Sequence, residues 1–118
     1  MKSFDDLLPP EAAARVIAYR RALDRALPGA VDSVVLFGSR ARGDARPDSD
    51  YDLAVLLRDD LARRPDVKAM VADEAFEHVI DGFEFTPVPL RADYLQPVDG
   101  HYRTELARRI AREGVLVP

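Results

Sequence analysis

The sequence predicts a small α/β domain with a mixed β-sheet and flanking helices. Its 118 residues suit a single domain that spans residues 1–118, and its hydrophobic share of 47% is enough to build a core. Segments with helical spacing alternate with short apolar runs, in the order helix, strand, strand, helix, strand, helix. The order of the strands within the sheet cannot be read from this pattern.

Three segments carry apolar residues at helical spacing, and each is bounded by residues that start or stop helices. The predicted helices cover about residues 10–27, 66–81 and, beginning at Gln96 or His101, the segment that ends at Glu113. Proline at position 10 suits a first helical turn, and Pro28-Gly29 ends the first helix. Asp66 is expected to cap the second helix.

Short runs rich in β-branched and aromatic residues predict the strands. They cover residues 31–37, 51–57 and 83–90, with 115–117 as a short final strand. The second run is almost continuously apolar, which indicates burial on both faces. The third run contains Pro87 and Pro89, and proline inside a strand indicates an edge position.

Charge and composition exclude several classes of function. The formal net charge of -4 argues against general nucleic-acid binding, although a local basic cleft for a phosphorylated ligand remains open. The lack of cysteine excludes disulfides, thiolate catalysis and zinc bound by thiolates. No apolar run reaches the roughly 18 residues of a membrane span, and the N-terminus has no signal-peptide core. We therefore expect a soluble cytoplasmic protein.

Two carboxylates stand at the start of the second strand. Side chains alternate along a strand, so Asp50 and Asp52 should point to one face and Tyr51 to the other. Two neighbouring carboxylates repel each other unless a cation lies between them. Magnesium prefers one or two carboxylates together with phosphate oxygens and water. Asp50 and Asp52 are therefore candidate metal ligands for phosphoryl or nucleotidyl transfer.

A glycine-framed turn, GSRARG at residues 38–43, precedes these acids. Gly38 would let the backbone approach a ligand closely, and Ser39 offers a hydroxyl and an amide to phosphate oxygens. Arg40 and Arg42 bring guanidinium groups to the same place. The two glycines have the spacing of a P-loop, but the Lys-Ser/Thr pair that must follow is missing, so this is not a Walker motif.

The combination of GSRARG and SDYDL resembles the signature of the polymerase-β-like nucleotidyltransferase superfamily. The preceding VVLF and the short chain are similar to the minimal nucleotidyltransferases, the antitoxin-type partners of HEPN toxins. This resemblance implies a polymerase-β palm-like fold in which Gly38 and Ser39 bind a nucleoside triphosphate and Asp50 and Asp52 ligate Mg²⁺. It also implies a third catalytic carboxylate from a later strand, for which Glu84 is the candidate.

The activity that this resemblance implies is transfer of AMP from ATP to a hydroxyl, specifically to a tyrosine of a HEPN toxin. Two alternatives remain open: an antitoxin that neutralises its partner by binding alone, and a transferase that acts on an antibiotic hydroxyl. The antibiotic transferase is the weakest of these possibilities, because no acceptor-binding domain is evident. Nucleotide preference and a homo- or hetero-oligomeric state are left open.

Each candidate residue also has a simpler explanation. An isolated Asp-x-Asp at a strand start is more often a solvated end than a metal site, and it is the upstream Gly38-Ser39 that favours nucleotidyl transfer. Arg40 and Arg42 could equally be solvated, and Glu84 could lie on an exposed strand face. The pair Arg108-Arg109 is most simply explained as surface charge of a helix.

Overall fold

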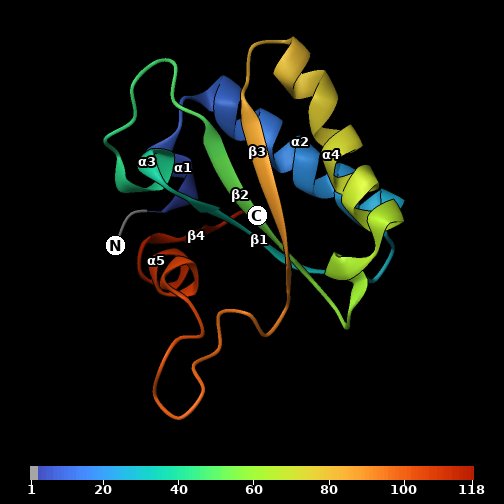
Figure 1. The fold of residues 1–118 in the computed structure, drawn as a ribbon. Coiled ribbons are helices and arrows are strands. Elements are labelled where there is room, and N and C mark those ends of the chain that lie inside the picture. Colours follow the sequence, from blue (N-terminus) through green and yellow to red (C-terminus); the bar gives the residue numbers. More distant parts are fainter. Residues whose placement is uncertain (1–2) are drawn as a thin grey trace.

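The fold, obtained as a computed structural model, is a four-stranded sheet flanked by helices, and the structure describes residues 3–118 (Figure 1). The strands are β1 (Val31–Phe37), β2 (Tyr51–Leu57), β3 (Phe85–Arg91) and β4 (Val115–Leu116). The helices are α1 (Phe4–Leu7), α2 (Pro10–Ala26), α3 (Ser39–Arg42), α4 (Pro65–Ile80) and α5 (Glu105–Glu113), with a 3-10 turn η1 (Leu61–Arg63). The predicted α/β class with a mixed sheet is confirmed.

The sheet has the strand order β3-β2-β1-β4. β1 is antiparallel to β2 and to β4, whereas β2 and β3 are parallel. A parallel pair needs a crossover connection, which α4 supplies. The predicted strands 31–37 and 51–57 are confirmed, and so is the edge position of β3. Pro87 and Pro89 are tolerated there because only one side of an edge strand needs backbone donors.

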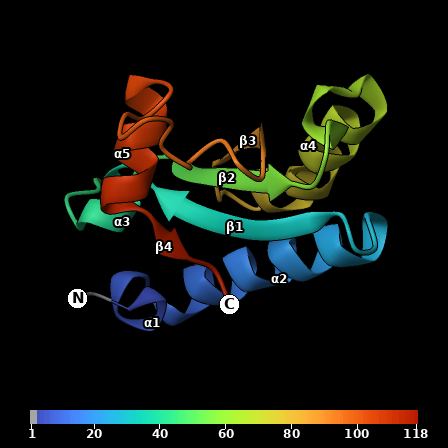
Figure 2. The ribbon, with the colours of Figure 1, turned by 90° about the horizontal axis from the view of Figure 1, so that it is seen from below.

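The two faces of the sheet carry different helices. Alternate residues of β1 and β2, such as Leu36 and Leu53, pack with α1, α2 and α4 in the larger core cluster. On the other face Val35, Phe37, Ala54 and Leu56 surround Ile110 of α5; these residues form the smaller cluster. Figure 2 shows α1 and α2 on one side of the sheet and α5 on the other. No helix within residues 3–118 is long and apolar enough to cross a membrane.

Some boundaries differ from those expected from the sequence. The last helix begins at Glu105 rather than near 96 or 101, because the hydroxyl of Thr104 caps it by accepting the N–H of Ala107 at 3.0 Å. The cap of α4 is Arg64, since Pro65 already occupies the first helical position, and Asp66 lies inside the first turn. The third strand begins at residue 85, two residues later than expected.

Tyr19 joins α2 to α4 through a buried hydrogen bond. Its side chain is fully buried, its hydroxyl donates to the carbonyl of Val71 at 2.8 Å, and burial raises the pKa of Tyr19 well above its usual value. We expect Tyr19→Phe to lower the free energy of unfolding by about 1 kcal/mol, because the variant loses a buried hydrogen bond between α2 and α4. Urea unfolding measures this change. Tyr102→Phe, at an exposed loop position, serves as control and should have no effect; equal stability of both variants would contradict the expectation.

Candidate active site

The two acids lie at the start of β2, on the face that α5 covers. Asp52 alternates with Ala54, which belongs to the smaller core cluster around Ile110 of α5. Asp50 is exposed and Asp52 is half-buried. In the sheet register Asp52 lies between Phe37 of β1 and Thr86 of β3. The acids therefore sit where β1 ends and β2 and β3 begin.

Gly38 brings the glycine turn directly against Asp52. Its backbone has φ +76°, which favours glycine, and a Cβ at this position would overlap Oδ2 of Asp52 and lie 3.2 Å from its Cγ. Glycine is therefore required at position 38, directly after β1, because any side chain there would occupy the space of the Asp52 carboxylate. The structure thus joins the two halves of the sequence motif in one contact.

The short helix α3 leaves backbone donors available beside this contact. The carbonyl of Gly38 accepts from Ala41 and Arg42, and the carbonyl of Ser39 accepts from Gly43. No hydrogen bond among the described residues uses the amides of Ser39 and Arg40, which lie in the first helical turn. These amides and the half-buried side chain of Ser39 can donate to phosphate oxygens.

Arg40 is engaged with the loop that leads to β2. Its guanidinium lies 4.3 Å from the centre of the Tyr51 ring and donates to the carbonyls of Ser49 at 2.9 Å and Pro47 at 3.3 Å. These contacts hold the loop 43–50 in place and so fix the approach to Asp50. The predicted role of Arg40 in phosphate binding remains a prediction.

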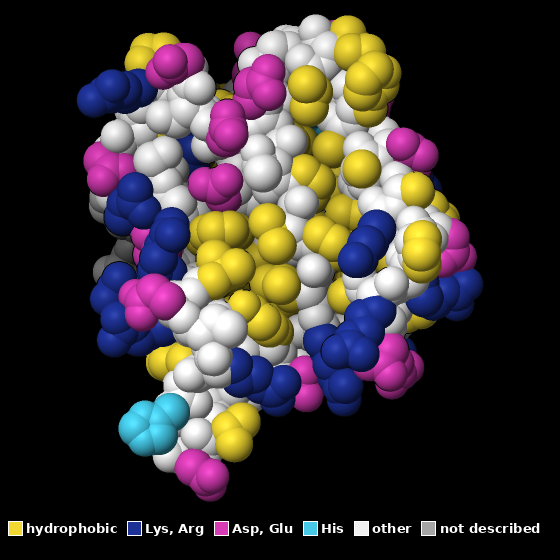
Figure 3. Space-filling view, viewed as in Figure 1, with side chains coloured by type: hydrophobic (Ala, Val, Ile, Leu, Met, Phe, Trp, Pro, Cys, Tyr) yellow, Lys and Arg dark blue, Asp and Glu magenta, His cyan; other side chains and the backbone are white. Residues whose placement is uncertain are grey.

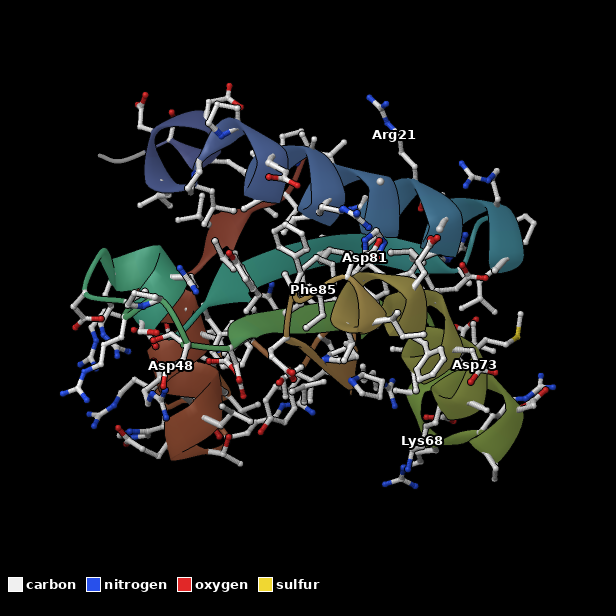
Figure 4. All side chains as sticks on the ribbon, turned by 90° about the horizontal axis from the view of Figure 1, so that it is seen from above. Arg21, Asp48, Lys68, Asp73, Asp81 and Phe85 are labelled. Carbon is white, nitrogen blue, oxygen red and sulfur yellow. The ribbon has the colours of Figure 1, made fainter. Side chains whose placement is uncertain are left out.

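Arg42 reaches the end of α5. Its guanidinium pairs with Glu113 at 2.8 Å and with Asp44 at 3.2 Å, and Arg109 approaches the other oxygen of Glu113 at 3.5 Å. The Glu113 side chain is only 10% exposed. Figure 4 shows nitrogen-tipped side chains gathered near the labelled Asp48, where α3 and α5 meet the loop. Sequence reasoning missed Arg109 and Glu113 because their place depends on β4 pairing with β1.

The charges around Asp52 oppose each other. Burial raises the pKa of Asp52, and repulsion from Asp50 raises it further, while Arg109 and Arg42 act to lower it. A carboxylate that is both desolvated and beside a second carboxylate gains from a cation. The oxygen ligands of Asp50 and Asp52 therefore fit a hard divalent cation such as Mg²⁺.

Two residues at the start of β3 complete this end of the sheet. Thr86 donates from its hydroxyl to Oδ2 of Asp50 at 3.2 Å, a contact that the sequence did not reveal. Glu84 precedes β3, is exposed and lines a cavity of about 210 Å³ together with Arg40 and Ser49. Among residues 3–118 no group of three or more acidic or histidine side chains could hold a metal ion. The catalytic role of Glu84 remains a prediction.

A carboxylate pair beside a glycine turn with available amides has donors and acceptors whose chemistry fits a phosphate-bearing ligand together with a divalent cation. Comparison with known proteins agrees: residues 16–112 match the family described as nucleotidyltransferase domain. The chain belongs to this family.

The fold agrees with the family. The crystal structure of a "putative nucleotidyltransferase" from Sulfolobus solfataricus matches with a TM-score of 0.60 and 20% sequence identity, over 90% of this chain and 78% of that chain. At this identity the likeness shows the nucleotidyltransferase fold. Comparison with curated proteins finds no match.

Proposed function

We propose that this chain is a Mg²⁺-dependent nucleotidyltransferase that transfers AMP from ATP to a hydroxyl group. The observation that carries the proposal is the contact of the Asp52 carboxylate with Gly38, beside the available amides of Ser39 and Arg40. Asp50 and Asp52 would hold the metal, which supplies positive charge to the reacting phosphate and the leaving group.

The chemistry is an in-line displacement at the α-phosphorus. The acceptor hydroxyl oxygen bonds to the α-phosphorus, the bond from that phosphorus to the oxygen bridging to the β-phosphate breaks, and pyrophosphate leaves. The hydroxyl proton passes to a carboxylate base, for which we propose Glu84. The amides of Ser39 and Arg40 bind phosphate oxygens and hold the nucleotide in place.

We propose a protein tyrosine as the acceptor, specifically a tyrosine of a HEPN-type toxin, which makes the chain an antitoxin. The support is the resemblance of the sequence to minimal nucleotidyltransferases, together with the exposure of Asp50 and Glu84. An exposed site can be reached by a side chain that a partner protein presents. The partner is expected among the products of neighbouring genes.

Label transfer tests this proposal. The protein is incubated with Mg²⁺ and ATP labelled at the α-phosphate, with and without the protein encoded beside it, and Asp52→Asn is the control. Transfer of label to the neighbour, and its loss in the control, is the expected result. If the wild-type chain labels neither the neighbour nor itself, the proposed activity is wrong.

A second candidate is an antitoxin that acts by binding alone. Two observations favour it. Among the described residues no third metal-binding side chain joins Asp50 and Asp52, and the uncharged Thr86 occupies the register position beside Asp52 on β3. A double variant, Asp50→Asn with Asp52→Asn, separates the two candidates. Neutralisation of the partner by this variant would support binding alone, whereas loss of neutralisation would support AMP transfer.

A further inference from the structure

The helix α5 flanks the acid pair on the face where both acids point. Ile110, which is 1% exposed, and the fully buried Ala107 anchor α5 to the sheet. This packing turns Arg109 and Glu113, which lie one helical turn apart, toward α3 and Asp52. Figure 3 shows Lys and Arg side chains gathered at the left of that view, where Figure 1 draws α3 and α5.

Arg109 has hydrogen-bond donors that no acceptor among the described residues uses. Glu113 is shared between two guanidinium groups, and it binds Arg42 at 2.8 Å but approaches only Nε of Arg109, at 3.5 Å. Within the described chain the Nη atoms of Arg109 make no hydrogen bond, and its side chain is 44% exposed. The contact of Nε with Glu113 at 3.5 Å is an ion pair without a hydrogen bond, so the Nη donors of Arg109 remain available to a ligand.

We propose that Arg109 binds the β- and γ-phosphates of the nucleoside triphosphate, so that α5 forms one wall of the nucleotide site. This inference rests on the proposed function. The reacting α-phosphate must lie at the acids, and the remaining phosphates carry most of the charge of the nucleotide. That negative charge must be balanced by positive groups in addition to the metal ion. Arg109 can supply one of them, because it lies beside Asp52 on a different element. Paired donors of a guanidinium fit the geometry of phosphate oxygens.

The opposing explanation is that Arg109 only neutralises Asp52 and has no ligand. The two explanations differ in their dependence on the length of the phosphate chain. Binding of the outer phosphates requires a larger effect of Arg109 on ATP than on AMP, whereas internal neutralisation affects both ligands alike.

The test measures dissociation constants of ATP and AMP, each with Mg²⁺, by titration calorimetry on the full chain. Arg109→Ala is expected to weaken ATP binding by about tenfold or more and AMP binding by less than about twofold. The ATP affinity of Arg109→Lys should lie between those of the wild type and Arg109→Ala. Arg108→Ala is the matched control: Arg108 neighbours Arg109, pairs with Glu105 at 2.7 Å and should not change either constant. Thermal unfolding verifies that each variant is folded.

Each outcome decides a different claim. If the wild-type chain fails to bind ATP, the proposed function is wrong and this inference falls with it. If the wild-type chain binds ATP and Arg109→Ala binds it equally well, only the inference about α5 is wrong. Equal weakening of ATP and AMP would also overturn it, since Arg109 would then act on the site as a whole.

Discussion

Asp52→Asn is expected to reduce AMP transfer by about a hundredfold or more while it makes the protein more stable at neutral pH. The activity falls because asparagine keeps the shape of the side chain but removes the charge that would bind the metal. The stability rises because the half-buried carboxylate is desolvated and repelled by Asp50, and both effects raise its pKa. Stability and function therefore oppose each other at this residue.

The gain in stability has a defined pH dependence. In the unfolded chain an aspartate titrates near about 3.9, and in the folded chain the pKa of Asp52 is higher. Between the two pKa values the folded chain binds more protons, so the contribution of Asp52 to stability falls as the pH rises. The Tm difference between Asp52→Asn and wild type should be largest at neutral pH and shrink toward pH 4.

The control for this comparison is Asp48→Asn, an exposed residue of the loop 43–50 that precedes β2, labelled in Figure 4. It should leave the Tm and the transfer activity unchanged. The comparison is made without divalent metal. If Asp52→Asn and wild type have the same Tm at every pH, the Asp52 carboxylate does not destabilise the folded protein and the expectation is wrong.

Gly38→Ala should lower both stability and activity. The residue must adopt φ +76° with ψ −158°, a combination essentially restricted to glycine that costs an alanine about 1–3 kcal/mol, and its Cβ would also collide with Asp52. Relief of the collision moves either the turn or the carboxylate, so the phosphate-binding amides and the metal ligands lose their alignment. Denaturant unfolding and label transfer measure the two effects.

Gly29→Ala is a control for a positive φ without a collision. Gly29 has nearly the same φ, +73°, but a Cβ there would meet nothing within 4 Å. We expect Gly38→Ala to cost clearly more than Gly29→Ala, and the part of the excess that comes from the collision to disappear when Asp52 is replaced by alanine in the same chain. Equal costs for the two glycines would mean that Gly38 and Asp52 are not in contact.

The elements that the sequence predicts well are those determined by neighbouring residues. Strands 31–37 and 51–57 are short apolar runs closed by turn residues, so local pattern defines both their existence and their ends. The glycine turn follows the first of these strands and the acid pair lies at the start of the second, so Gly38 and Asp52 are only 14 positions apart in the sequence. Once these strands pair as a hairpin, Gly38 and Asp52 must meet.

The contacts that the sequence does not reveal depend on strand order. Thr86 reaches Asp50 because β3 is parallel to β2, and Arg109 reaches the site because β4 returns beside β1. Neither pairing is encoded in a local pattern. The predicted start of the last helix, near residue 96 or 101, is also wrong, since the Thr104 cap is a single hydroxyl contact within a polar segment. Thr86 and Arg109 therefore join the candidate site through the pairing of distant strands, which a local sequence pattern does not reveal.

The most direct test of the proposed metal and nucleotide site is a crystal structure of the protein with Mn²⁺ and a non-hydrolysable ATP analogue. Manganese takes the oxygen ligands that magnesium takes, and its anomalous signal identifies its position. We expect a manganese peak at the carboxylates of Asp50 and Asp52, with the triphosphate against the turn at Gly38 and Ser39. Nucleotide bound at another place, or bound at this turn without metal at the two acids, would contradict the proposed function.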